Sequence, residues 1–209
     1  MCIRDRCGAC SCGASTRLCS TLPPTMYALA PPRIAAVTRL DPRRSNKHIQ
    51  LSDLDRRATT DARWCSAVAD HPGAVTGTVR FAVQLEGDGG AAVGFADTNT
   101  FKPYMQNLGA STGTWALSKS GKKSSGDADG FTPFTEKLSG GDIIGCEADM
   151  DAGVITFWKN GECLGAAFTG LAERGYCMGA AVCIGSNGGG KDSTVRFVEF
   201  NPAWAGSVA

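Results

Sequence analysis

Apolar side chains recur at every second position in several short stretches of the chain. Residues 79–86 and 144–150 show this alternation most clearly, with polar or small residues between the apolar ones. A period of two is typical of a β-strand that has one buried and one wetter face. Clusters of Gly, Asp, Asn and Ser separate the apolar runs, and a helical period is hard to find. The pattern predicts an all-β domain, either a sandwich or a barrel.

The segment 141–168 predicts a three-stranded antiparallel meander. Two turns separate its apolar runs, and the second turn falls at the dipeptide Asn160-Gly161. Asn-Gly between such runs favours a type I′ turn, in which both central residues have a positive φ. Phe157 and Trp158 in the middle strand should lie on opposite faces, with at least one of them in the core. Gly165 and the two alanines after it predict a close approach of the returning strand to another part of the fold.

The first 37 residues show no usable period and contain two Pro-Pro pairs. This composition predicts a disordered tail, residues 1–37, ahead of one domain, residues 38–209. The opening MCIRDR resembles translated sequencing-adapter sequence, so an artefactual origin is one explanation of the tail and an organelle transit segment is another. The spacing Cys7-x-x-Cys10-x-Cys12 is incomplete as a zinc site, because no second pair of ligands follows it.

Charge is distributed unevenly along the chain. Residues 1–37 hold four Arg and one Asp, a net charge of +3, whereas the other 172 residues hold 17 basic and 19 acidic side chains, a net charge of −2. Binding of nucleic acid usually needs several basic groups on one surface, so nucleic acid is not an expected partner. No apolar run approaches the length of a membrane span, so we expect no membrane partner either.

Ten cysteines could suggest a disulfide framework. Five of them lie in the first 37 residues, and four others lie inside apolar, strand-like runs: Cys146, Cys163, Cys177 and Cys183. Buried free thiols that act as small apolar residues explain the second group best. Because free thiols are typical of a reducing compartment, we expect an intracellular, cytoplasmic domain.

A series of motifs runs through the chain after residue 40. LDPRRSNKHIQLSDLDRRATTDARW stands at 40–64, VGFADTNT at 93–100, GDIIGCEADMDAGVITFWKNGECLGAAF at 141–168 and VRFVEF at 195–200. This series resembles the SPRY domain, and the third motif is its most specific part. One departure lies at Arg80-Phe81-Ala82, where members of that family commonly carry two aromatic residues and a glutamate. The resemblance implies a bent antiparallel β-sandwich of two sheets, a concanavalin A-like jelly roll.

The resemblance also implies a non-catalytic protein–protein interaction module. Such domains bind a short peptide segment or a surface of a partner protein through loops at one end of the sandwich. The matching positions in this chain form the predicted peptide-binding site: Asp97, Thr98, Asn99, Tyr104, Ile184, Gly185 and Ser186. We expect their loops to lie side by side, with Tyr104 as an amphipathic anchor and Asp97 as a hydrogen-bond acceptor. The alternative for these two is that Tyr104 caps the core and Asp97 supports a turn.

Other functional classes rest on weaker motifs. Glu147, Asp149 and Asp151 alternate on one strand face, and residues two apart would lie about 7 Å from each other, a spacing that suits an inverting glycosidase. A carbohydrate-binding or glycoside-cleaving sandwich is therefore the alternative function, although no sugar-stacking aromatic residue is visible on that strand face. A structural part of a larger assembly is a third class.

The stretch GSNGGGKDS at 185–193 resembles a phosphate-binding loop, but Asp192 replaces the Ser or Thr and a strand follows it instead of a helix. We therefore expect a hairpin loop at this position. Taken together, the motifs predict no enzyme activity, no cofactor and no metal, and a monomeric domain whose partner is another protein.

Overall fold

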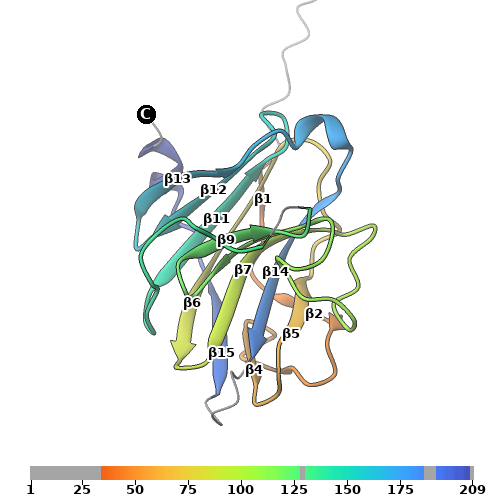
Figure 1. The fold of residues 1–209 in the computed structure, drawn as a ribbon, viewed down its shortest axis with the longest axis vertical. Coiled ribbons are helices and arrows are strands. Elements are labelled where there is room, and N and C mark those ends of the chain that lie inside the picture. Colours follow the sequence, from red (N-terminus) through yellow and green to blue (C-terminus); the bar gives the residue numbers. More distant parts are fainter. Residues whose placement is uncertain (1–33, 128–129, 186–191, 208–209) are drawn as a thin grey trace, which may run out of the picture. The chain divides into compact units, whose positions relative to one another are not determined.

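Two β-sheets pack face to face and enclose one main apolar core (Figure 1). The computed structural model describes residues 34–127, 130–185 and 192–207. Within these ranges, the regular structure consists of strands and two short 3-10 helices. The predicted all-β sandwich is confirmed. The predicted disorder of residues 1–33 lies outside the described residues and stays a prediction.

The first sheet has the strand order β13-β12-β11-β6-β15-β4-β3, with β1 paired to β6 beside this path. Its strands are β1 (Ile34–Ala36), β3 (Gln50–Ser52), β4 (Arg57–Thr60), β6 (Thr78–Gly87), β11 (Ile143–Asp149), β12 (Val154–Lys159), β13 (Glu162–Phe168) and β15 (Ser193–Val198). The pairing of β1 with β6 is parallel. The other pairings described in this sheet are antiparallel.

The second sheet has the strand order β10-β9-β8-β7-β14-β5-β2 and is antiparallel in all the pairings described. Its strands are β2 (Leu40–Ser45), β5 (Cys65–Ala69), β7 (Gly90–Asp97), β8 (Thr114–Ser118), β9 (Lys122–Ser125), β10 (Thr132–Pro133) and β14 (Met178–Gly185). The 3-10 helices are η1 (Ala172–Arg174), before β14, and η2 (Pro202–Ser207), after β15.

Aromatic rings from both sheets meet in the core. Phe81 on β6 packs edge-on against Phe95 on β7, with 5.3 Å between the ring centroids, and stacks on Phe197 on β15 at 5.6 Å. All three side chains are fully or almost fully buried. They occupy inward positions of strands whose sequences alternate, so the two-residue period correctly identified the core face of β6.

The predicted meander is confirmed as β11, β12 and β13. The β12–β13 turn has φ 53° at Asn160 and 92° at Gly161, which are the two positive values that a type I′ turn requires. The Asn160 side chain ties this turn to the start of β11. Its Oδ1 accepts a hydrogen bond from the Ile143 N–H (2.8 Å), and its Nδ2 donates to Asp142 Oδ1 (2.8 Å).

Phe157 and Trp158 on β12 lie on opposite faces, as predicted, and both are buried. Phe157 belongs to the core between the sheets. Trp158 lies on the outer face of the first sheet and packs against Ala82 and Phe200. Its Nε1 donates to the Trp204 carbonyl oxygen (3.1 Å), so helix η2 covers this outer face.

Gly165 on β13 has a role that differs from the predicted one. A Cβ at this position would have no atom within 4 Å, so the predicted close approach at Gly165 is wrong. Its φ of 89° lies in the left-handed region, and the β12–β13 register shifts nearby, between Phe157 and Trp158. The glycine therefore supplies the backbone conformation of a bulge.

Residues 34–37 fall in the range that the sequence assigned to the tail, yet they pack on the domain. Ile34–Ala36 pair with Thr78–Arg80, and the Val37 N–H donates to the Arg80 carbonyl oxygen (3.0 Å). The Val37 side chain is only 4% exposed. The packed domain therefore begins before residue 38. The four apolar residues that follow Pro-Pro-Arg here are too few to show a period.

The cysteines of the described residues are free thiols, as predicted. Cys146 and Cys183 are buried, whereas Cys163 and Cys177 are only half-buried. Burial raises the pKa of Cys146 well above its usual value and that of Cys183 to about 11. Both buried thiols therefore stay neutral at physiological pH and pack as small apolar groups.

Candidate binding surface

The strand register separates the predicted site residues into two groups. β7 and β14 are antiparallel neighbours, with Asp97 opposite Met178 and Gly90 opposite Gly185. An eight-residue strand has seven steps of about 3.3 Å, so the two ends of this strand pair lie roughly 23 Å apart. The prediction that Asp97 and Ile184 lie side by side is therefore wrong. The end of one strand lies beside the start of its antiparallel neighbour. Ser186 lies outside the described residues.

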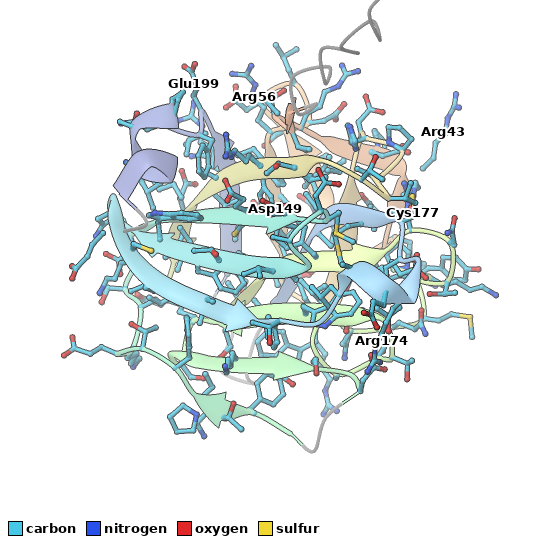
Figure 2. The ribbon with its side chains drawn as sticks, turned by 90° about the horizontal axis from the view of Figure 1, so that it is seen from above. Arg43, Arg56, Asp149, Arg174, Cys177 and Glu199 are labelled. Carbon is cyan, nitrogen blue, oxygen red and sulfur yellow. The ribbon has the colours of Figure 1, made fainter. Side chains whose placement is uncertain are left out.

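Asp97 closes the turn after β7. Its buried carboxylate, on a residue that is 6% exposed, accepts hydrogen bonds from the Asn99 N–H (3.3 Å), the Thr100 hydroxyl (2.8 Å) and the Cys177 N–H (3.1 Å). The last bond ties the turn to the residue before β14. Figure 2 looks onto this end of the domain, which also carries Arg174. The geometry matches the alternative in which Asp97 supports a turn.

Thr98 also has partners within the domain. Its hydroxyl donates to the Pro72 carbonyl oxygen (3.0 Å), and its N–H donates to the Cys177 carbonyl oxygen (2.8 Å). Asn99, next in the chain, is exposed. The turn that carries these residues is thus held in place by hydrogen bonds within the domain.

Tyr104 belongs to the long connection from β7 to β8, which folds back over the outer face of the second sheet. Leu108 of this connection packs in an apolar cluster on that face, and its N–H donates to Ser66 Oγ (3.3 Å). The Tyr104 carbonyl oxygen accepts from Asn46 Nδ2 (3.4 Å). The Tyr104 residue itself is 60% exposed, and Met105 beside it is 76% exposed. The alternative that Tyr104 caps the core does not fit this exposure.

Ile184 and Gly185 end β14 at the opposite end from Asp97. Ile184 is fully buried in the core, so its side chain supports the surface from beneath. A Cβ on Gly185 would lie 2.6 Å from the Trp64 nitrogen, and a Cβ on Gly90 would lie 2.6 Å from Trp64 Cη2. The two glycines therefore make room for Trp64.

Trp64 was not among the residues that the sequence predicted for the site. It precedes β5 and is 38% exposed, although its ring packs on Gly90 of β7 and its backbone on Gly185 of β14. A tryptophan just before a buried strand, flanked by Arg63, was the available signal. The register that brings glycines from two other strands beneath it could not be read from the sequence.

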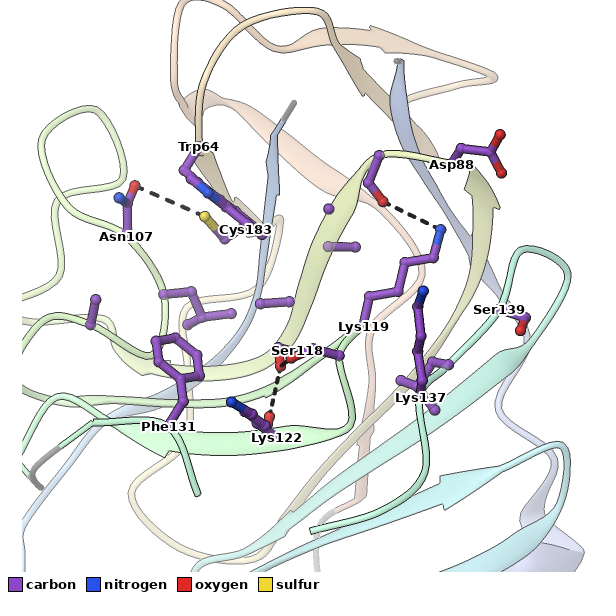
Figure 3. Close-up of a pocket in the computed structure, with 18 of the residues that line it drawn as sticks. Trp64, Asp88, Asn107, Ser118, Lys119, Lys122, Phe131, Lys137, Ser139 and Cys183 are labelled. Carbon is purple, nitrogen blue, oxygen red and sulfur yellow. Dashed lines mark hydrogen bonds between the residues drawn. The ribbon is translucent and has the colours of Figure 1, made fainter. Parts of the chain in front are cut away.

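A groove of about 780 Å³ opens beside Trp64 (Figure 3). Ala92 and Cys183, from the apolar cluster on the outer face of the second sheet, contribute to its floor. Trp64 and Asn107 line one side, and Phe131 lies below them in the view of Figure 3. Three lysines complete the lining: Lys119, Lys122 and Lys137.

The lysines differ in their partners. Lys119 Nζ donates to the carbonyl oxygens of Gly87 (2.8 Å) and Gly89 (3.3 Å), and so holds the β6–β7 hairpin. Lys122 and Lys137 are exposed. Within the described part of the chain, neither of these two ammonium groups has an ion pair. The groove thus combines apolar surface with two available positive charges.

The carboxylates considered for glycoside cleavage have structural partners instead. Glu147 on β11 forms an ion pair with Arg80 on the neighbouring β6. Asp149 Oδ1 accepts from the N–H groups of Asp151 (3.0 Å) and Ala152 (2.9 Å), and Asp151 Oδ1 accepts from the Gly77 N–H (3.0 Å). Each carboxylate therefore holds a turn or a strand pair.

The ranges 34–127, 130–185 and 192–207 contain neither a cluster of metal ligands nor a membrane-spanning helix. Among the residues described, no three His, Cys, Asp or Glu side chains come together as metal ligands would. Of the helical segments in those ranges, none has the length and apolar character to cross a bilayer.

Comparisons with known proteins agree with this fold. The model of the SPRY domain matches residues 78–195, more than half of the 209-residue chain. The chain is 29% identical over 119 residues to the probable ATP-dependent RNA helicase ddx1 of Dictyostelium discoideum, a match covering 57% of this chain and 15% of the relative. It is 34% identical over 86 residues to the SPRY domain-containing SOCS box protein 3 of Xenopus tropicalis, covering 39% and 23% of the two chains.

A solved structure of a SPRY domain has the same fold as this chain. The SPRY domain of human HERC1 superposes with a TM-score of 0.63 and 19% identity, covering 78% of this chain and 98% of that one. At this identity the likeness shows the fold alone. The chain also spans less than a quarter of the length of the two curated relatives. The match to the family model over more than half of the sequence shows that the chain belongs to the SPRY domain family.

Proposed function

We propose that this domain is a non-catalytic interaction module that binds a short segment of a partner protein. The proposed surface is centred on Trp64 and the groove beside it, where β7 begins and β14 ends. It extends to Tyr104 and Met105, exposed residues of the β7–β8 connection, whose Asn107 and Leu108 line the groove. Trp64 is the observation that carries the proposal. Its ring lies against Gly90, its backbone lies against Gly185, and the residue is 38% exposed and borders a groove. Tryptophan and tyrosine are enriched among the residues that dominate binding energy at protein interfaces.

The rigidity of the surface supports the proposal. Trp64 is fixed by close packing, and the connection that carries Tyr104 is fixed by hydrogen bonds to Asn46 and Ser66. Binding to a surface that is already ordered costs less conformational entropy than binding to a mobile loop. We therefore expect Tyr104, rather than Asp97 or Ile184, to contact the partner directly. Asp97 and Ile184 stabilise the fold beneath their respective loops.

The free cysteines and the lengths of the relatives bear on where the domain acts and on what it is part of. Free thiols in the described strands and loops are compatible with a reducing, intracellular compartment. One relative is named for a SOCS box and another for an RNA helicase, and each is several times longer than the matched segment. We therefore expect the domain to act as the recognition unit of a longer protein and to be monomeric when isolated.

Peptide-display selection on the full chain tests the proposal, followed by calorimetric titration of a selected synthetic peptide. We expect Trp64→Ala and Tyr104→Ala each to weaken binding by about 1–3 kcal/mol, the size of a loss at an interface hot spot. Val75→Ala is the matched control, because Val75 is also an exposed apolar residue but lies outside the groove lining. Wild-type affinity in both aromatic variants would place the site elsewhere. Binding of glycans that is lost in Trp64→Ala would favour the carbohydrate alternative.

A further inference from the structure

The groove concentrates positive charge in a domain that is otherwise slightly acidic. Residues 38–209 hold 17 basic and 19 acidic side chains, whereas the groove lining has three lysines and one carboxylate, Asp88. Lys119 is committed to backbone carbonyls of the β6–β7 hairpin. Lys122 and Lys137 remain, each exposed and without an ion pair among the described residues. The groove therefore offers two cations to a ligand.

Apolar surface lies next to these cations. Trp64 is 38% exposed and Phe131 47% exposed, and both line the groove. The floor adds Ala92, Leu108 and the Cys183 thiol, which burial keeps neutral. Apolar side chains of a ligand would be removed from water between the two aromatic rings, at about 25 cal/mol per Å² of buried apolar area.

The number of cations favours a polypeptide over a nucleic acid. Proteins that bind nucleic acid gain much of their affinity by neutralising several phosphates with Lys and Arg. Two available lysines suit one or two carboxylates instead, because a lysine ammonium acts as a single point charge. In Figure 3, Lys119 and Lys137 rise on one side of the groove and Trp64 lies on the other. Lys122 lies lower in the same view, next to Phe131. One available lysine is thus opposite Trp64 and the other is beside Phe131.

We infer that the groove selects an extended, acidic segment of a partner protein, in which Asp or Glu residues flank a bulky apolar side chain. The carboxylates would be bound by Lys122 and Lys137, and the apolar side chain would lie between Trp64 and Phe131. This inference rests on the proposed function and adds the chemistry of the partner to it.

Fluorescence anisotropy of the full chain with four labelled 12-residue probes tests the inference. The first probe is a peptide pool with one Leu, Phe or Trp flanked by Asp and Glu. In the second pool Lys replaces the acidic residues, and in the third Ala replaces the apolar residue. The fourth probe is a single-stranded RNA of 12 uridines. We expect the first pool to bind at least about tenfold more tightly than the others, a difference equal to about 1.4 kcal/mol.

Charge-reversal variants test whether Lys122 and Lys137 bind the acidic residues of the peptide. We expect K122E/K137E to weaken binding of the acidic pool at least about tenfold, and K122Q/K137Q to weaken it less, because it removes attraction without adding repulsion. R43E/R56E is the matched control. It changes the net charge equally, and both arginines are exposed, lie outside the groove lining and are labelled in Figure 2. We expect the control to bind within about twofold of wild type, since distant exposed charges are screened by salt.

Several results would overturn the inference. Equal binding of the acidic and basic pools would exclude charge selection, and tighter binding of the RNA would indicate a nucleic-acid site. Wild-type affinity of K122E/K137E for the acidic pool would exclude the two lysines. If display-selected peptides lose affinity in Trp64→Ala but not in K122E/K137E, the result supports the proposed function and refutes selection of an acidic segment. If no peptide binds at all, both the proposed function and this inference are refuted.

Discussion

At the scale of single residues, a residue that the sequence assigned to the binding site can instead stabilise the fold. Asp97 was predicted to contact a bound peptide, yet its carboxylate is buried and accepts three hydrogen bonds from its own domain. Trp64 shows the reverse. It lies in a stretch with no binding motif, but Gly90 leaves room for its ring and Gly185 for its backbone. Residue type and position alone did not separate these two roles, because the partners of each side chain come from remote parts of the sequence.

The hydrogen bonds of Asp97 lead to the first prediction. Asp97→Ala leaves the N–H of Cys177 and the hydroxyl of Thr100 without their acceptor, so we expect the free energy of unfolding to fall by about 2–3 kcal/mol in urea titrations. Asn99→Ala is the control, because its side chain is exposed and should change stability by less than about 0.5 kcal/mol. Equal midpoints for the two variants would show that Asp97 does not stabilise the turn.

A second prediction concerns His71 and pH. Burial lowers the pKa of His71, an effect that the nearby Asp70 charge partly opposes. His71 Nδ1 also accepts a hydrogen bond from the Gly73 N–H (3.0 Å), which a proton on Nδ1 would abolish. The unfolded chain therefore binds the proton more readily than the folded domain. Stability should accordingly fall as the pH drops below the unfolded-state pKa of about 6.5.

Thermal melts between pH 8 and pH 5.5 test this direction. We expect His71→Gln to lose less stability than wild type over that interval, because Gln does not titrate and keeps a hydrogen-bond acceptor. The same loss of stability in the variant and in wild type would assign the pH dependence to other groups.

At the scale of elements, the sequence predicted those strands and turns whose conformation is set by residues close to them in the chain. The meander of β11, β12 and β13 followed from alternation and from the Asn160-Gly161 turn, because both signals act within a few residues. β1 was missed, because its three residues gain their conformation from pairing with β6, more than 40 positions later in the chain. Gly165 was assigned a packing role, because a glycine in a strand can mark either a close approach or a bulge.

The pairing of β1 leads to a third prediction. A chain that starts at residue 34 should melt like the full chain, because residues 1–33 lack apolar periodicity. A chain that starts at residue 38 loses the β1–β6 pairing and the burial of Val37, so its free energy of unfolding should be about 2 kcal/mol lower. Urea titration of the three chains measures both differences. Equal stability of the two shortened chains would show that β1 adds nothing, and a lower stability of the chain from residue 34 would show that the preceding residues contribute.

At the scale of the whole molecule, the sandwich was predictable but the layout of its ends was not. The two-residue period and the family motifs indicate two sheets, since each strand needs one apolar face. The placement of loops depends on which strands are neighbours and in which direction they run. The register of β7 and β14 puts Asp97 at one end and Gly185 at the other, and this separated residues that the sequence had grouped into one site.

The separation of the two ends leads to the last prediction. If the proposed surface is correct, a bound peptide will contact the end near Gly90 and Gly185 but not the end near Asp97 and Met178, roughly 23 Å away. Hydrogen–deuterium exchange of the full chain, with and without a display-selected peptide, measures this difference. We expect slower exchange in peptic fragments that span residues 60–65 and 104–110, because a ligand there excludes water from Trp64 and Tyr104. Fragments spanning residues 97–100 serve as the internal control, since the hydrogen bonds of Asp97 hold that turn in either state. Protection confined to residues 97–100 would place the binding site at the opposite end of the sandwich and would refute the surface proposed around Trp64.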